Sequence, residues 1–125
     1  MKTTLKNGCL LLLLACVIHL LSCEEIIGEE DISEVQLVLT APSDGAVLTE
    51  TDITLSWEPL KGADQYHIQI ATPSFEGALQ VVKDSILPGN NLSVALTPNA
   101  YEWRVKAVNS AFETEFSTGA FSINK

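Results

Sequence analysis

Few side chains in this sequence could act as an acid, a base or a nucleophile. His67 is the one histidine after position 22, and it stands between apolar Tyr66 and Ile68. The Gly-x-Ser-x-Gly pattern of an activated serine does not occur. The 16 Asp and Glu residues could in principle supply a glycosidase pair, but they are spread along the chain. We therefore predict no catalytic residue and no enzyme, and interpret His67 as a surface residue.

A bound metal or cofactor is disfavoured for the same reason. Zinc sites use several His or Cys ligands, and one residue of each type remains after position 22. No Gly-rich phosphate loop or calcium-binding loop is found. Asp44, Gly45 and Asp64 are interpreted as turn residues. We expect no metal and no cofactor.

Glycan binding would need aromatic faces on the surface. The aromatic residues Trp57, Trp103, Tyr66 and Tyr101 are in phase with predicted core positions. Phe75, Phe112 and Phe116 remain, all in predicted loop or edge segments. These three could contact a ligand, or they could cap the ends of the domain, and capping is the favoured interpretation.

Two short motifs concern glycosylation. Asp84-Ser85-Ile86 resembles the three-residue acceptor for O-glycosylation in some anaerobic bacteria, and a turn before Pro88 would expose it. Ser85 is therefore a candidate modification site. Asn91-Leu92-Ser93 is a formal N-glycosylation sequon, which we interpret as part of a turn and a strand.

Residues 1–22 have the layout of an export signal. Lys2 and Lys6 precede an apolar run over residues 9–21, and polar sequence returns at Cys23. That run of about 13 residues is shorter than the roughly 20 that a helix needs to cross a bilayer. We predict a signal peptide over residues 1–22 and no transmembrane anchor.

The end of this segment looks like the lipobox of bacterial lipoproteins. In Leu20-Leu21-Ser22-Cys23, the resemblance implies a diacylglyceryl group on the Cys23 thiol and cleavage just before it. Leu13-Leu14-Ala15-Cys16 also fits, but it would leave a very short apolar region, and Cys23 as an ordinary thiol is a third alternative. Cleavage before Cys23 would remove the other two cysteines, so the mature chain could form no internal disulfide. Two acyl chains suffice for stable membrane attachment.

Residues 23–34 form a predicted acidic tether. Six carboxylates lie within eleven residues, namely Glu24, Glu25, Glu29, Glu30, Asp31 and Glu34. We expect mutual repulsion to keep this stretch extended and solvated. A linker without further meaning is the favoured interpretation. The alternative is that these acids resemble the signal by which some bacteria export lipoproteins to the outer surface.

The net charge limits the partners. The whole chain has a formal charge of -9, and loss of Lys2 and Lys6 with the signal would leave -11. A nucleic-acid binder that neutralises phosphates is therefore excluded. No cluster of Lys or Arg is present to hold anionic lipid headgroups.

From Val35 onward, short segments of alternating polarity are separated by turns that contain proline. Alternation places every second side chain against a core. The apolar positions of the clearest segments are Val35, Leu37 and Leu39; Ile53, Leu55 and Trp57; Tyr66, Ile68 and Ile70; Leu92, Val94 and Leu96; Tyr101, Trp103, Val105 and Ala107; and Phe121 and Ile123. Val81 and Val82 are adjacent and break the period of another segment. Such a series predicts an all-β antiparallel sandwich over residues 35–125.

Three segments of this region resemble a fibronectin type III domain. They are Thr54–Trp57, Gly62–Ile70 and Leu96–Asn109. The resemblance implies a single immunoglobulin-like sandwich of about seven strands, with Trp57 and Tyr66 in the core and Tyr101 anchoring a corner between strands. Leu96 and Tyr101 are five positions apart where animal modules usually have six, which shortens that corner. A second similarity, over 42–45 and 69–71, is to N-terminal domains of starch-utilisation outer-membrane lipoproteins.

These features together predict a non-catalytic lipoprotein of the bacterial cell envelope. We expect it to be attached to the outer membrane through its lipid and to bind a glycan or an envelope protein. The alternative is a structural spacer or an accessory subunit of an outer-membrane assembly, with no ligand of its own.

Overall fold

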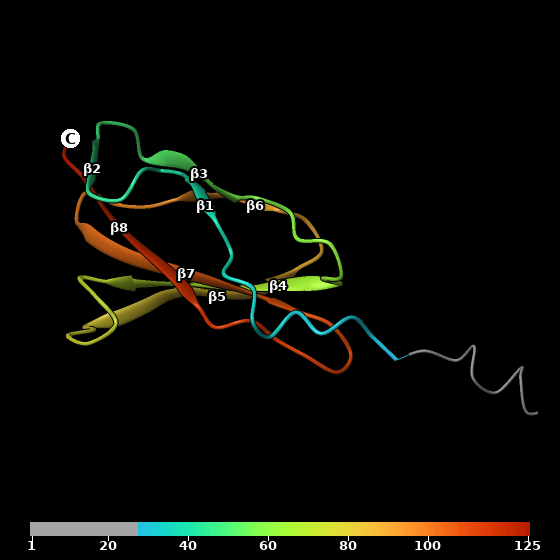
Figure 1. The fold of residues 1–125 in the computed structure, drawn as a ribbon. Coiled ribbons are helices and arrows are strands. Elements are labelled where there is room, and N and C mark those ends of the chain that lie inside the picture. The colour runs from blue at the N-terminus through green and yellow to red at the C-terminus, as the bar shows by residue number, and fades with distance from the viewer. Residues whose placement is uncertain (1–27) are drawn as a thin grey trace, which may run out of the picture.

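The computed structural model describes residues 28–125. The predicted signal peptide and Cys23 lie outside the described residues. The described chain forms eight strands: β1 (Leu39–Ala41), β2 (Ala46–Leu48), β3 (Asp52–Trp57), β4 (Gln65–Thr72), β5 (Gln80–Leu87), β6 (Asn91–Ala95), β7 (Ala100–Val108) and β8 (Ser117–Ile123). They build two sheets that face each other (Figure 1). The predicted all-β sandwich is confirmed.

One sheet has the strand order β1-β3-β6, and the other has the order β2-β8-β7-β4-β5. All pairs are antiparallel except β2 and β8, which run parallel. The turn before β2 explains this exception. Gly45 has φ +81 and its N–H donates to the Ala120 oxygen at 2.7 Å, while an Asp44 carboxylate oxygen accepts from the Ala120 N–H at 2.9 Å. The chain thereby leaves the first sheet at β1 and joins the edge of the second.

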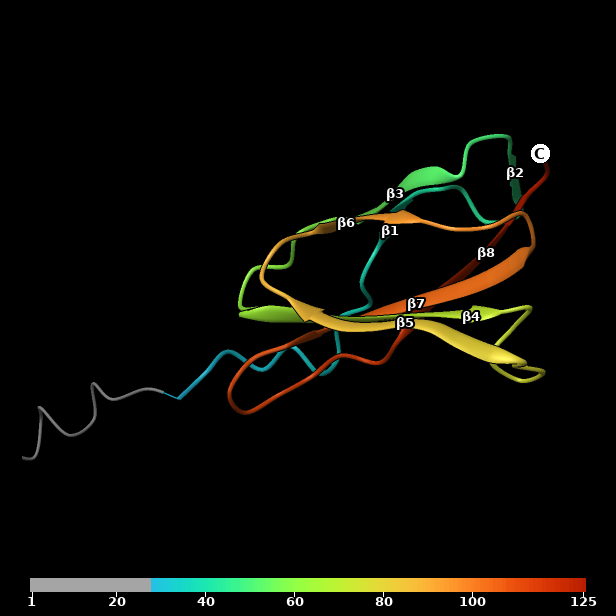
Figure 2. The ribbon, with the colours of Figure 1, turned by 180° about the vertical axis from the view of Figure 1, so that it is seen from behind.

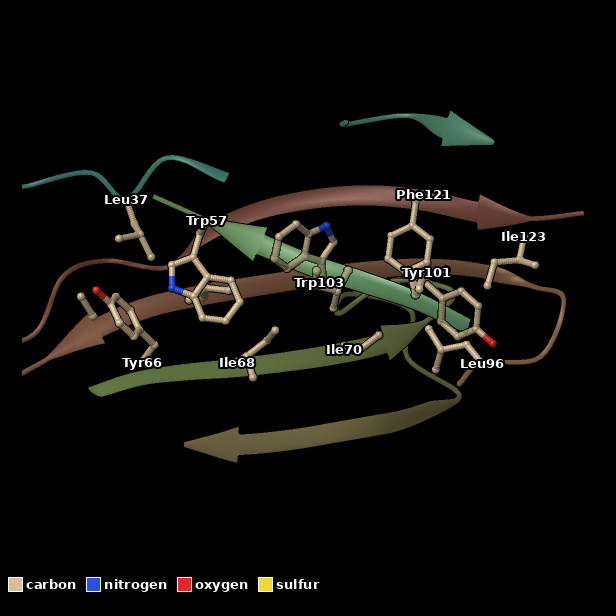
Figure 3. Close-up of a cluster of buried hydrophobic side chains, with 14 of the residues drawn as sticks. Leu37, Trp57, Tyr66, Ile68, Ile70, Leu96, Tyr101, Trp103, Phe121 and Ile123 are labelled. Carbon is tan, nitrogen blue, oxygen red and sulfur yellow. The ribbon is translucent and has the colours of Figure 1, made fainter. Parts of the chain in front are cut away.

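The core lies between the two sheets (Figure 3). The alternating residues of β3, β4 and β7 meet there, as the sequence predicts. Trp57 contacts Tyr66 edge to face, with ring centroids 5.6 Å apart, and its ring lies 6.4 Å from that of Trp103. Both tryptophans are essentially inaccessible to solvent. Their burial confirms that they serve the fold and offer no face to a ligand.

Tyr101 makes the corner that the resemblance implies. Its hydroxyl donates to the backbone oxygen of Thr97 at 2.6 Å, and its ring stacks on Phe121 with centroids 5.4 Å apart. The short spacing between Leu96 and Tyr101 is therefore compatible with the hydrogen bond.

The adjacent valines of β5 mark a β-bulge. Ile70 is opposite Lys83 and Ala71 is opposite Val81, so Val82 is an extra residue without a partner across the pair. Val82 packs against the core, whereas Val81 is 52% exposed. A bulge shifts the alternation by one position, which is why the period breaks here although the strand continues to Leu87.

The N-terminal segment differs from expectation. The first strand begins at Leu39, not Val35, which is exposed. The described part of the expected solvated tether, residues 28–34, lies against the domain, and its Ile32 side chain is 1% exposed and belongs to the core cluster. Ile32 is the departure from the expected solvated stretch, because its burial outweighs the mutual repulsion of the neighbouring acids, which remain exposed.

Candidate functional site

The outer face of the five-stranded sheet carries the main cluster of charged and aromatic side chains. On β4, buried Tyr66, Ile68 and Ile70 alternate with half-buried His67 and Gln69. On β7, half-buried Glu102, Arg104 and Lys106 alternate with buried core residues in the same way. Because β4 and β7 are neighbours with Gln69 opposite Arg104, these outward side chains form one continuous surface.

Arg104 lies between two phenylalanine rings. Its guanidinium carbon is 4.1 Å from the Phe75 ring centroid and 4.4 Å from that of Phe116. The Phe75 N–H donates to Glu102 at 3.0 Å, which places Phe75 toward one end of β7. Phe116 instead contacts the Lys106 side, with the Lys106 Nζ 4.8 Å from its centroid. The two rings therefore approach the guanidinium from opposite directions and hold it by cation–π contact.

A chain of hydrogen bonds continues from Arg104 across the sheet. The Arg104 Nε donates to the Gln69 side-chain oxygen at 2.8 Å, and the Gln69 amide donates to Asp84 at 3.3 Å. His67 Nε2 donates to the other Asp84 oxygen at 2.6 Å. The hydrogen bond from His67, followed by that from Gln69, lowers the pKa of Asp84 from its ordinary value. The negative charge of Asp84 is thereby stabilised.

The remaining members complete the surface. The ring of His67 lies 5.8 Å from that of Phe116, and Lys106 forms an ion pair with Glu113 at 3.1 Å. We call this set the outer-face cluster: Phe75, Phe116, Arg104, Gln69, His67, Asp84 and Lys106. It joins β4, β5 and β7 to the β4–β5 loop and to the segment before β8.

Only two of the three phenylalanines considered as ligand contacts belong to this cluster. Phe112 lies in the β7–β8 loop and packs, half-buried, against the core. Its N–H donates to the Asn109 side-chain oxygen at 2.8 Å. Its position agrees with the favoured interpretation of a cap on the end of the sandwich.

Ser85 lies within β5 instead of in a turn before Pro88. It is opposite Ile68 in the β4–β5 pair and is half-buried. The expectation that a turn exposes it is wrong, because β5 extends to Leu87. Glycosylation of Ser85 stays a prediction.

The cluster brings cationic, anionic and aromatic side chains together on one face of the sheet. His67 and Asp84 resemble the base and orienting acid of a triad, but among residues 28–125 no serine or threonine hydroxyl hydrogen bonds to the His67 ring. No group of three or more metal-ligating side chains occurs in the same part of the chain. The described residues also contain no helix of the length and apolar character needed to cross a membrane.

A groove is found elsewhere on the domain. It runs between residues 36–39, the turn at Pro42–Asp44 and Ser117–Gly119 of β8. It has no aromatic lining residue. The aromatic surface and the groove are therefore separate features.

The sequence indicated Phe75 and Phe116 as candidate contact residues but not their partner, Arg104. The signal that could have found Arg104 is its place on the outward side of an alternating strand. What the sequence does not give is the path of the two loops that carry the rings.

Comparisons with known proteins bear on the fold. No family model matches this chain, and no curated protein matches it either. Among solved structures, it is similar to the fibronectin(III)-like modules of Clostridium thermocellum CbhA, with a TM-score of 0.52 and 10% identity over 71% of this chain and 96% of that one. It is also similar to the fn3 domain of the human collagen alpha-1(XX) chain, with a TM-score of 0.55 and 18% identity over 74% and 90% of the two chains. The described domain therefore has a fibronectin type III-like fold.

Proposed function

We propose that this chain is a lipid-anchored, non-catalytic binding module of the bacterial outer membrane. Its partner is a glycan or an envelope protein. Domains with this fold commonly serve as binding or spacer modules. Support for the anchor comes from the lipobox-like segment that ends at Cys23.

The observation that carries the binding function is the position of Arg104 between Phe75 and Phe116. Among the described residues, the hydrogen bond of its side chain runs through Nε to Gln69, which leaves the two Nη groups for a partner. A guanidinium held in place by two aromatic rings is preorganised for a planar acceptor such as a carboxylate or an amide. The ring edges add apolar contact area beside it.

A structural spacer is the second candidate, and a different observation favours it. The two rings already stack on Arg104, and Phe112 packs on the core. A cluster whose members contact one another can stabilise the sheet without any ligand. The domain would then act as an accessory subunit of a larger assembly.

The experiment compares partners captured by the natural chain and by a cluster variant. The chain is purified in detergent, probed on a glycan array and analysed for proteins that co-purify. The variant is Phe75→Ala with Phe116→Ala, which removes both rings and leaves the capping residue Phe112 in place. The matched control is Leu79→Ala, because Leu79 is 89% exposed and lies outside the cluster.

A sugar signal that the variant loses and the control keeps supports the glycan function. A stoichiometric protein partner with the same response supports the envelope-protein function. A protein partner that the variant retains would show that the cluster is not the contact surface and would favour the accessory subunit. A chain that captures neither sugar nor protein would favour the spacer.

A further inference from the structure

Residues 28–34, which we call the strap, are bound to one end of the sandwich. Ile32 lies in the core at 1% exposure. A Cβ on Gly62 would lie 2.8 Å from the Glu30 Oε2 atom and 3.1 Å from the Ile32 Cγ2 atom. Glycine at position 62 therefore leaves the space that the strap occupies.

Polar contacts hold the strap on its other side. The Asn109 side-chain amide donates to the Glu30 backbone oxygen at 2.8 Å and to the Gly62 backbone oxygen at 3.0 Å. The Ser110 hydroxyl donates to a Glu29 carboxylate oxygen at 2.8 Å. The strap therefore contacts two loops, one at Gly62 and one at Asn109–Ser110.

These loops mark one pole of the domain. Gln65 at the start of β4 is opposite Val108 at the end of β7, and Tyr66 is opposite Leu87. The loops 60–64, 88–90 and 109–115 therefore gather at the same end, which we call the strap pole. The loops 42–45, 73–79 and 97–99 gather with the C-terminus at the other end, the far pole (Figures 1 and 2).

The chain between Cys23 and the strap is shorter than the distance between the two poles. The chain from Cys23 to Gly28 spans at most about 18 Å, at about 3.3 to 3.6 Å per residue. Strand β7 has nine residues, so at about 3.3 Å per residue the two poles are about 30 Å apart. Without the strap contacts, the free chain would extend to residue 34 and reach about 40 Å.

We propose that the strap fixes the orientation of the domain on the membrane, with the strap pole toward the lipid surface and the far pole away from it. This inference rests on the proposed attachment through Cys23. The strap acids Glu29, Glu30, Asp31 and Glu34 are exposed. Anionic headgroups repel such a surface, so the strap pole faces the bilayer without entering it.

The test measures how close each pole lies to a bilayer. The chain that begins at Cys23 is labelled isotopically and coupled through its one thiol to a maleimide lipid in a nanodisc. Paramagnetic lipid headgroups then enhance the relaxation of nearby backbone amides. We expect severalfold greater enhancement at the amides of Ala63 and Ala111 than at those of Gly45 and Asn99. Equal enhancement at the two poles would overturn the inference.

Two variants separate the strap from the attachment itself. A Gly/Ser insertion of about twelve residues between Glu25 and Ile26 adds roughly 20 Å of mean reach, leaves the described residues intact, and should reduce the difference between the poles. Ile32→Asp should release the strap from the domain and should also reduce the difference in relaxation enhancement between the poles. Its matched control is Val35→Asp at a site that is 40% exposed, which should keep the difference. A difference unchanged by both the insertion and the release would also overturn the inference.

The coupling chemistry keeps this test independent of the proposed function. The maleimide lipid attaches the chain whether or not the cell acylates Cys23. Natural acylation is measured separately, by the mass of the protein from bacterial membranes. If the relaxation enhancement differs between the poles but natural Cys23 is unmodified, the orienting effect of the strap is supported and the proposed lipid anchor is contradicted.

Discussion

The Cγ2 atom of Ile32 lies 3.1 Å from the point where a Cβ on Gly62 would stand. Gly62 also has φ +92, a backbone conformation that other residues rarely adopt. One residue therefore serves both the turn between β3 and β4 and the docking of the strap. This double demand makes Gly62 more sensitive to substitution than Gly45, which has positive φ but open space around it.

Three Gly→Ala variants should differ in stability for this reason. Gly45 and Gly89 both have open space around them, but only Gly45 has a positive φ. We expect Gly45→Ala to lower the free energy of unfolding by about 1 to 2 kcal/mol. Gly62→Ala should lower it further, because the new methyl group also displaces the strap. Urea denaturation of the three variants measures the order of their free energies of unfolding.

Gly89→Ala is the control and should stay within about 0.5 kcal/mol of the natural chain. Equal stability of the Gly62 and Gly45 variants would contradict the close contact between Gly62 and the strap.

The hydroxyl of Tyr101 should contribute measurably to stability. Tyr101→Phe removes its 2.6 Å hydrogen bond to the Thr97 backbone oxygen and leaves the ring stacked on Phe121. We expect a loss of about 0.5 to 1.5 kcal/mol in the free energy of unfolding. Thr97→Val is the control, since it keeps the backbone acceptor and changes only a 3.3 Å side-chain contact. A larger loss in the control than in Tyr101→Phe would refute the role of the hydroxyl.

Stability should depend on the ionisation of Asp84. Hydrogen bonds from His67 and then Gln69 lower the pKa of Asp84 in the folded chain, so the folded state favours the carboxylate. The resulting stabilisation is complete above the ordinary pKa of an unfolded aspartate and is lost as the pH falls through the lower folded value. The difference in unfolding free energy between the natural chain and Asp84→Asn should therefore be largest near neutral pH and shrink in acid.

Chemical denaturation over a series of pH values measures this difference. Asp52→Asn is the control, because no hydrogen bond joins the Asp52 side chain to another described residue. An Asp84→Asn difference that stays constant down to strong acid would contradict the stabilising hydrogen bonds.

The sequence predicted the core better than the edges of the fold. Alternation in β3, β4 and β7 identified Trp57, Tyr66 and Trp103 as buried, because each strand has one face toward the opposite sheet. Alternation failed at Val82, because a bulge changes which face of the sheet the following side chains occupy. It also failed at Ile32, a buried residue in a segment that the surrounding acids made look solvated. The parallel pairing of β2 depends on where a turn delivers the chain, and short-range pattern carries no such information.

The candidate site was predicted only in part. Elimination of core aromatics left Phe75 and Phe116, which the structure brings to one arginine. The same elimination kept Phe112, whose packing against the core depends on the path of the β7–β8 loop. Loop paths are set by tertiary contacts, so the sequence could identify these residues as candidates but could not distinguish surface residues from a capping residue.

The proposed location and the proposed orientation both depend on the proposed attachment through Cys23, which is tested most directly by the intact mass of the protein extracted from bacterial membranes. The predicted result is a chain that begins at Cys23 and carries the added mass of its acyl groups. A soluble protein cleaved elsewhere, with an unmodified Cys23 thiol, would contradict it.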